Sequence, residues 1–148
     1  MTPRKLATAL VLVAVLAVLP ACGIIGTDNR TTSEQVGSWF DVGGRDASSK
    51  LFSDYLTVKT AINAPDGGTS LYAACQQMRT DVLVAGALDQ DHPLPGDLGK
   101  KWDSALLHMS AFDSACLNGD GNTAGKEFAA IDMLQLQADL TTRYLGTN

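Results

Sequence analysis

The residues able to do chemistry are few, and their spacing matches no common catalytic motif. The sequence holds two histidines, His92 and His108, and 14 of its 16 acidic residues are aspartates. It contains no Glu-x-x-His, His-x-x-x-His, Cys-x-x-Cys-His or Gly-x-Ser-x-Gly motif, which removes the usual signatures of di-iron, zinc, haem and hydrolase sites. No acidic pair is arranged for acid–base work along the sequence, while a pair formed across helices stays open.

Two weaker metal patterns have simpler structural explanations. Three methionines on different expected helices suit an apolar core, although thioethers also bind Cu(I) or haem iron. Asn118, Asp120 and Asn122 alternate as at the start of a calcium loop. However, Thr123 replaces the required glycine and Ala129 stands where the bidentate glutamate belongs. We therefore expect no metal and no cofactor.

The N-terminus has the three zones of an export signal. A cationic start at positions 4–5 precedes an apolar run over 6–19 and small residues around Cys22. The sequence Leu-Pro-Ala-Cys over 19–22 resembles the lipobox of bacterial lipoproteins, although Pro20 departs from the usual pattern. In that family the cysteine sulfur receives a diacylglyceryl group, and a peptidase cuts just before it. The resemblance implies that 1–21 is a cleaved signal peptide and that Cys22 is the lipid-modified first residue.

The alternative is an uncleaved membrane anchor over 6–26, an uncharged stretch long enough to span a bilayer. Pro20 and two glycines make its second half a poor helix. In either case Arg4 and Lys5 stay on the cytoplasmic side, so the rest of the chain faces outward. We expect a protein of the cell membrane that faces the extracytoplasmic side.

The charge of the mature chain excludes some partners. Loss of 1–21 lowers Lys+Arg from 11 to 9 against 16 acidic residues, so the formal net charge moves from −5 to −7. An acidic surface argues against nucleic acid, whose phosphates require clustered Lys and Arg. It also argues against the protein body lying on anionic lipid, so the lipid on Cys22 must hold the chain at the membrane.

With Cys22 assigned to lipid, Cys75 and Cys116 remain as an even pair in an oxidising compartment. This favours a disulfide between them. Two free buried thiols are the alternative.

Three regions follow along the chain: the signal peptide 1–21, a flexible tether 22–45 rich in Gly, Thr, Ser and Asp, and a helical domain 46–148. The aromatic pair Trp39-Phe40 interrupts the tether, and we favour its packing back on the domain over contact with a membrane or partner. Apolar spacings of three and four residues predict four helices, at about 47–63, 70–88, 97–117 and 123–145.

Four helices with short loops predict an all-α, antiparallel four-helix bundle with one inter-helix disulfide. Cys75 lies early in the second predicted helix and Cys116 at the end of the third, and these ends are neighbours in an antiparallel hairpin. The pair Cys75 and Cys116, the Trp102 to Leu106 run and the helical pattern also loosely resemble small helical lipoproteins of actinobacteria with no assigned function. That resemblance implies a disulfide-bonded helical fold and no activity.

Leu83, Val84, Leu106 and Leu107 lie off the predicted seams of their helices. A wide apolar face explains them in most globular helices, and an interaction patch is the alternative. We expect a non-enzymatic module that binds an envelope protein or has a structural role. A carrier for a small apolar ligand or lipid is the second hypothesis, because small residues such as Ala85, Ala105 and Ala129 leave room in a core.

Overall fold

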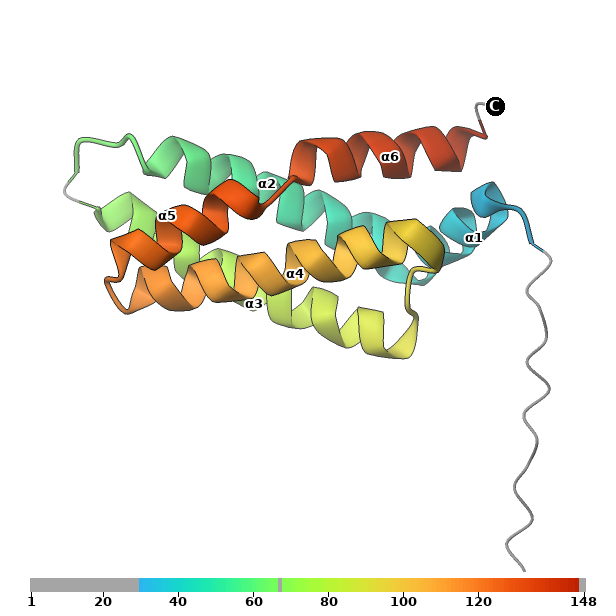
Figure 1. Cartoon of the computed structure of the whole chain (residues 1–148), viewed down its shortest axis with the longest axis horizontal. Coiled ribbons are helices and arrows are strands. Elements are labelled where there is room, and N and C mark those ends of the chain that lie inside the picture. The colour runs from blue at the N-terminus through green and yellow to red at the C-terminus, as the bar shows by residue number, and fades with distance from the viewer. Residues whose placement is uncertain (1–29, 67, 147–148) are drawn as a thin grey trace, which may run out of the picture.

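The computed structural model describes residues 30–66 and 68–146, and every regular element in that part of the chain is helical. Figure 1 shows the elements, and the predicted all-α class is confirmed. The predicted signal peptide, Cys22 and the first residues of the predicted tether lie outside the described residues. Within the described residues, no helix combines the length and apolar character needed to cross a bilayer. The elements are α1 (Thr32–Trp39), the π-helical turn η1 (Phe40–Gly44), α2 (Arg45–Ala61), α3 (Thr69–Asp91), α4 (Gly96–Leu117), α5 (Gly121–Ala130) and α6 (Met133–Leu145).

Residues 32–44 are folded and belong to the domain, which corrects the tether predicted up to residue 45. α1 begins with a capping box, in which the side chains of Thr31 and Glu34 each accept the other residue's backbone N–H. α1 lies against α6, where Ser33 Oγ donates to the Tyr144 carbonyl at 2.8 Å. Its buried side chains are those of Val36 and Trp39. Sequence periodicity missed this helix because two apolar side chains in eight residues form no sustained stripe.

The aromatic pair packs back on the domain, as the sequence favoured. Trp39 is only 3 % exposed, and its ring meets that of Trp102 edge-on at 5.0 Å between centroids. Phe40 is half-buried, with its ring 5.1 Å from that of Tyr144. Gly44 closes over the Trp39 ring so tightly that a Cβ atom would lie 2.2 Å from it. Only glycine therefore permits this approach of the backbone to the indole.

α2, α3 and α4 supply most of the core, with α3 packed against both of the others (Figure 1). The apolar side chains that recur every three or four residues along these helices, which form their predicted seams, are buried or half-buried. One exception is Ile62, which is 48 % exposed and follows directly after Ala61, the last residue of α2. The seam side chains with no exposed surface are Leu51, Val58, Cys75, Met78, Ala85, Trp102 and Met109.

The fourth predicted helix, 123–145, is two helices, which is a correction to the sequence prediction. α5 stops at Ala130, because Ile131 has extended backbone dihedrals (φ −79°, ψ 111°) and its side chain is buried. Asp132 then caps α6, and its carboxylate accepts the Gln135 N–H at 3.3 Å. The break lets α5 pack on α4 while α6 continues against α1, α2 and α4.

Candidate functional site

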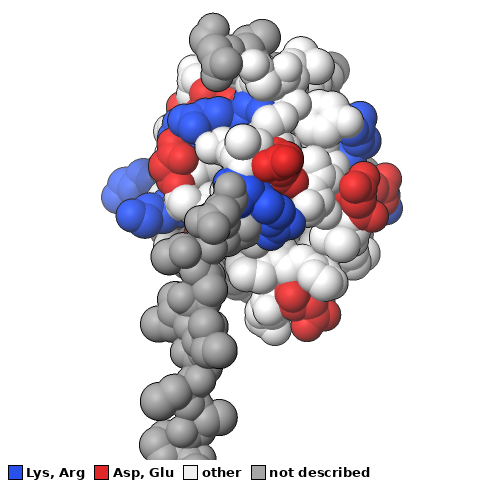
Figure 2. Space-filling view, turned by 90° about the vertical axis from the view of Figure 1, so that its right-hand side faces the viewer, with Lys and Arg blue, Asp and Glu red and all other residues white. Residues whose placement is uncertain are grey.

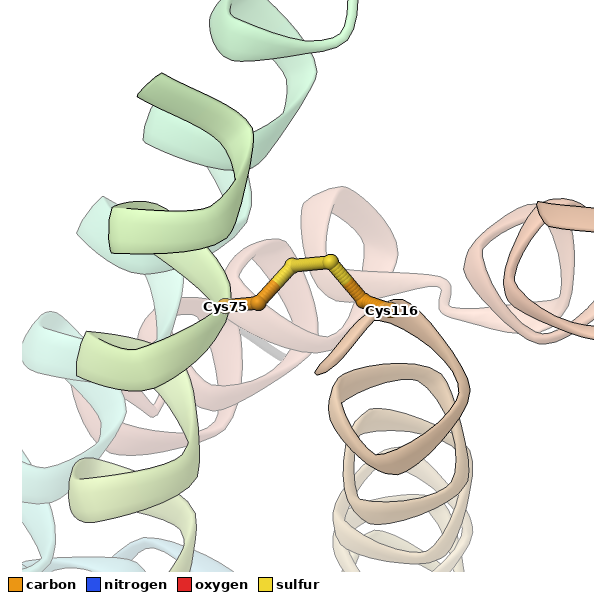
Figure 3. Close-up of a disulfide and its surroundings, with 2 residues drawn as sticks. All are labelled: Cys75 and Cys116. Carbon is orange, nitrogen blue, oxygen red and sulfur yellow. A yellow bond between two sulfur atoms is a disulfide. The ribbon is translucent and has the colours of Figure 1, made fainter. Parts of the chain in front are cut away.

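The two cysteines of the helical domain form a disulfide, which confirms the predicted pair. Cys75 lies in the second turn of α3 and is fully buried, and Cys116 is half-buried in the last turn of α4. Their Cα atoms are 6.4 Å apart, within the range that a bridge spans without backbone movement. Figure 3 shows the bond running directly from one helix to the other. The bridge ties α3 to α4 at one end of both helices.

Three of the four residues in the predicted interaction patch are strongly exposed. Leu83 and Leu107 each expose 68 % of their surface, and Val84 exposes 58 %. Leu106 differs, because it packs against the core at the side of α4. We call Leu83, Val84 and Leu107 the α3/α4 apolar residues. Each of them exposes apolar surface to water, and this surface takes no part in the packing of the core.

Neither histidine has the neighbours of a metal ligand. His108 Nδ1 lies 2.7 Å from Glu127 Oε2, and this half-buried contact joins α4 to α5. His92 is exposed in the loop after α3. Among the described residues, no three His, Cys, Asp or Glu side chains are grouped so that they could hold a metal ion. Met78, Met109 and Met133 are fully buried, as expected of core side chains.

An acidic pair across α2 and α3 is a feature that sequence reasoning left open. Asp54 on α2 is 8 % exposed, and its Oδ2 atom has no hydrogen-bond partner among the described residues. The pKa of Asp54 is raised to about 7, mainly by burial and further by the facing Asp81 carboxyl on α3, which acts as a like charge and a hydrogen-bonding neighbour. Asp81 Oδ2 also accepts a hydrogen bond from Gln77 Nε2 at 2.6 Å.

A second acidic pair lies between α3 and α4. Burial raises the pKa of Asp89 on α3, and the charge and hydrogen bonding of Asp103 on α4 raise it further. Asp89 Oδ1 is buried without a hydrogen-bond partner among the described residues. Further along α4, Asp113 is 4 % exposed, and its pKa is raised by burial although the charge of Arg79 opposes the rise. Carboxyl groups with raised pKa values therefore occur on both sides of α3.

A hollow of about 300 Å³ opens at the end of the molecule where the disulfide lies. It is enclosed by the end of α2, the start of α3, the end of α4 and the start of α5. None of the residues that line it carries a charge, and glycines form much of its rim. Its apolar walls include Ile62, Leu71, Phe112, Cys116 and Ala124. This volume is at the lower end of the range of small-molecule sites.

No protein-family model, curated protein or solved structure matches this chain.

The apolar residues on α3 and α4 were visible in the sequence because they break the helical seam. The carboxyl pairs were not, because Asp54 and Asp81 are 27 positions apart (81 − 54) and only the packing of α2 on α3 brings them together. One signal was available: Asp54 falls within the apolar rhythm of its helix, between Leu51 and Val58. A polar residue at a seam position needs a partner when it is buried.

Proposed function

We propose that this chain is a lipid-anchored protein of the extracytoplasmic membrane surface that binds another envelope protein rather than catalysing a reaction. The observation that carries the proposal is the exposure of Leu83, Val84 and Leu107 on neighbouring helices. Large apolar side chains left in water on adjacent elements are typical of interaction sites. The resemblance of residues 19–22 to a lipobox supports the location.

The anchor would hold the folded domain close to the membrane. Eight residue steps separate Cys22 from Arg30, the first described residue, and a fully extended chain of that length spans about 28 Å. Figure 2 looks at the end of the molecule that holds α1, where basic and acidic side chains are mixed rather than separated by sign. A mixed surface gives little attraction to anionic lipid, which supports anchoring through the lipid on Cys22.

The charge of the chain favours a different protein as the partner over a second copy. With its signal peptide removed, the chain carries a formal net charge of −7 (9 basic and 16 acidic residues), so two copies repel one another at long range. We therefore expect a partner with an apolar contact surface and a neutral or basic surround. Burial of three exposed aliphatic side chains would then supply the contact energy.

Site-specific photo-crosslinking in the intact envelope tests this surface. A photoreactive residue placed at position 83 or position 107 should yield the same crosslinked partner, because both positions face the bound protein. Replacement of Leu83 by Gln should lower the yield from position 107 several-fold. It should change the free energy of unfolding by less than about 0.5 kcal/mol, as at ordinary surface sites.

Leu134 provides the matched control, because it is 54 % exposed and lies on α6 rather than on α3 or α4. A crosslinker at position 134 should not capture the same partner. Equal capture from position 134 would mean that the contact is nonspecific. Capture of only a second copy of this chain would contradict the assignment to a different protein.

The hollow beside the disulfide favours a second candidate function, the binding of a small apolar ligand. The probe N-phenyl-1-naphthylamine tests it by fluorescence titration. Gly125 lines the hollow, and a Cβ atom there meets nothing within 4 Å, so Gly125→Leu should fill the space and abolish saturable binding. Gly86→Leu on α3, where a Cβ atom is equally unhindered, should leave binding unchanged. Unsaturable binding in the unmodified chain would eliminate this function.

We also propose that α2, α3, α4 and the α5–α6 pair are arranged as an antiparallel bundle. The bond from an early turn of α3 to the last turn of α4 supports this arrangement, as does the short connection between these two helices. A crystal structure tests it through the relative directions of the four segments.

A further inference from the structure

α3 is bordered on two sides by acidic pairs. On one side Asp81 faces Asp54 of α2, and on the other Asp89 faces Asp103 of α4. In each pair one member has a buried oxygen without a hydrogen-bond partner among the described residues, Asp54 Oδ2 or Asp89 Oδ1. Two carboxylates that are both charged repel at such an interface, whereas one protonated and one charged carboxyl attract. The packing of α3 therefore favours one retained proton in each pair.

The neighbouring charges do not neutralise these pairs. Lys50 on α2 acts on Asp81 only at a distance, because its Nζ pairs directly with Asp46 at 2.8 Å. Gln77 on α3 donates to Asp81 without adding charge. Around Asp89, the Leu94 backbone N–H donates a hydrogen bond that lowers the pKa of this carboxyl and partly offsets the rise. The cation on α3 that faces α4, Arg79, acts on the buried Asp113.

A proton suits these sites better than a metal ion. Calcium takes six to eight oxygen ligands, and magnesium requires near-ideal octahedral geometry. Each pair offers two carboxyl groups, and no third His, Cys, Asp or Glu joins either pair within the described part of the chain. Asp54 is also too deeply buried for water to complete a coordination shell.

We propose that α3 is held in the domain by protons shared within these two carboxyl pairs, so that its contacts with α2 and α4 weaken when those protons are lost. We call the two pairs the proton clasp of α3. The helix that the clasp controls also carries Leu83 and Val84. Its loosening would alter the apolar face that those residues form, whatever partner that face binds.

The sign of the effect follows from the direction of the shift. The folded-state pKa of Asp54 is about 7, above the ordinary value of about 3.9 for an unfolded chain. Its contribution to stability is therefore fully present below about pH 3.9 and is lost as the pH rises through about 7. The raised pKa of Asp89 acts in the same direction. Carboxylates with lowered pKa values, such as the exposed Asp66 and the half-buried Asp139, act oppositely, but only in more acidic solution.

Thermal unfolding of the full chain between pH 5 and pH 8 tests the clasp. The unmodified protein should lose about 5 °C or more in Tm over this interval. The double variant Asp54→Asn with Asp89→Asn should lose less than half as much, because an amide donates a hydrogen bond at every pH. Asp91→Asn, an exposed position on the same helix, is the matched control and should keep the full loss. If the double variant does not fold, Asp81→Asn tests one pair from its half-buried partner.

Amide hydrogen exchange, corrected for the intrinsic effect of pH, provides the local readout. Protection in α3 should fall between pH 5 and pH 8 by a larger factor than protection in α6, which carries neither pair. If the Tm of the double variant falls between pH 5 and pH 8 as much as that of the unmodified chain, the proposal is wrong. A loss of protection that is equal in α3 and α6 would overturn it as well, because it would indicate a general effect of charge.

Discussion

Cys75 and Cys116 are the residues whose chemistry contributes most directly to stability. They are 41 positions apart in the sequence, so the bond removes many conformations from the unfolded chain. For a loop of this size the chain-entropy model gives a stabilisation of about 4 kcal/mol. Because Cys75 is fully buried beside Met78, its sulfur also contributes to core packing. The bond thus adds to the stability that the small hydrophobic core of this domain provides.

Replacement of both cysteines by serine should lower the free energy of unfolding by about 2–5 kcal/mol. Chemical denaturation of the two proteins measures the difference, and thiol titration of the unmodified domain should find neither cysteine free. Addition of reductant to the serine variant is the control, and it should leave its Tm unchanged. Two titratable thiols in the unmodified domain would contradict the pairing.

Among the elements, the junction of α5 and α6 decides the course of the last third of the chain. Ile131 is buried with extended dihedrals, and Asp132 directs the chain into a new helix through its cap. The buried side chains of α6, Met133, Leu136 and Leu140, can then follow a different line from α5. A single straight helix would keep one direction and would not lie along both α4 and α1.

Loss of the α6 cap should therefore destabilise the domain modestly. We expect Asp132→Ala to cost about 1 kcal/mol, because the Gln135 N–H loses its acceptor at the first turn of α6. Equilibrium unfolding in urea measures the change. Asp132→Asn keeps a good capping side chain and should recover most of the loss. If Asp132→Ala and Asp132→Asn lower the free energy of unfolding equally, Asp132 has a role other than capping.

For the molecule as a whole, the proposed lipid anchor would hold the chain at the membrane, and the folded domain would bind the partner. The domain begins at α1, so residues 22–29 are the longest stretch available as a tether, shorter than the 22–45 that composition indicated. Under the proposed anchoring, a short tether would keep the α3/α4 apolar residues near the membrane and limit the proteins that they can reach. The proton clasp would add a response to the pH of the compartment outside the cytoplasmic membrane.

Replacement of Cys22 by serine should abolish lipid labelling and leave unprocessed precursor, because a hydroxyl group does not take the place of the thiol. Mass spectrometry and membrane partitioning measure the two effects. The serine variants of Cys75 and Cys116 should still be lipidated, which separates processing from folding. Equal mass and partitioning of the unmodified chain and Cys22→Ser would refute the lipid anchor.

The sequence by itself determined the all-α class, the three long helices α2 to α4 and the cysteine pair. These rest on local periodicity and on a count of residues, which need no knowledge of distant contacts. The burial of Trp102 and Met109 was readable for the same reason, since a sustained stripe of apolar residues must face a core.

Only the tertiary structure determined the burial and the contacts of residues whose neighbours come from distant segments of the chain. α1 is stabilised by its contact with α6, at the other end of the chain, and its own eight residues carry too little pattern to predict it. In the sequence, Asp89 looks like an ordinary surface aspartate, and Asp54 is marked only by its place in the apolar rhythm of its helix; their facing carboxyls are brought to them when α3 packs between α2 and α4. Burial and facing carboxyls then change their pKa values, because desolvation and like charge depend on what lies across an interface and not on neighbours in sequence.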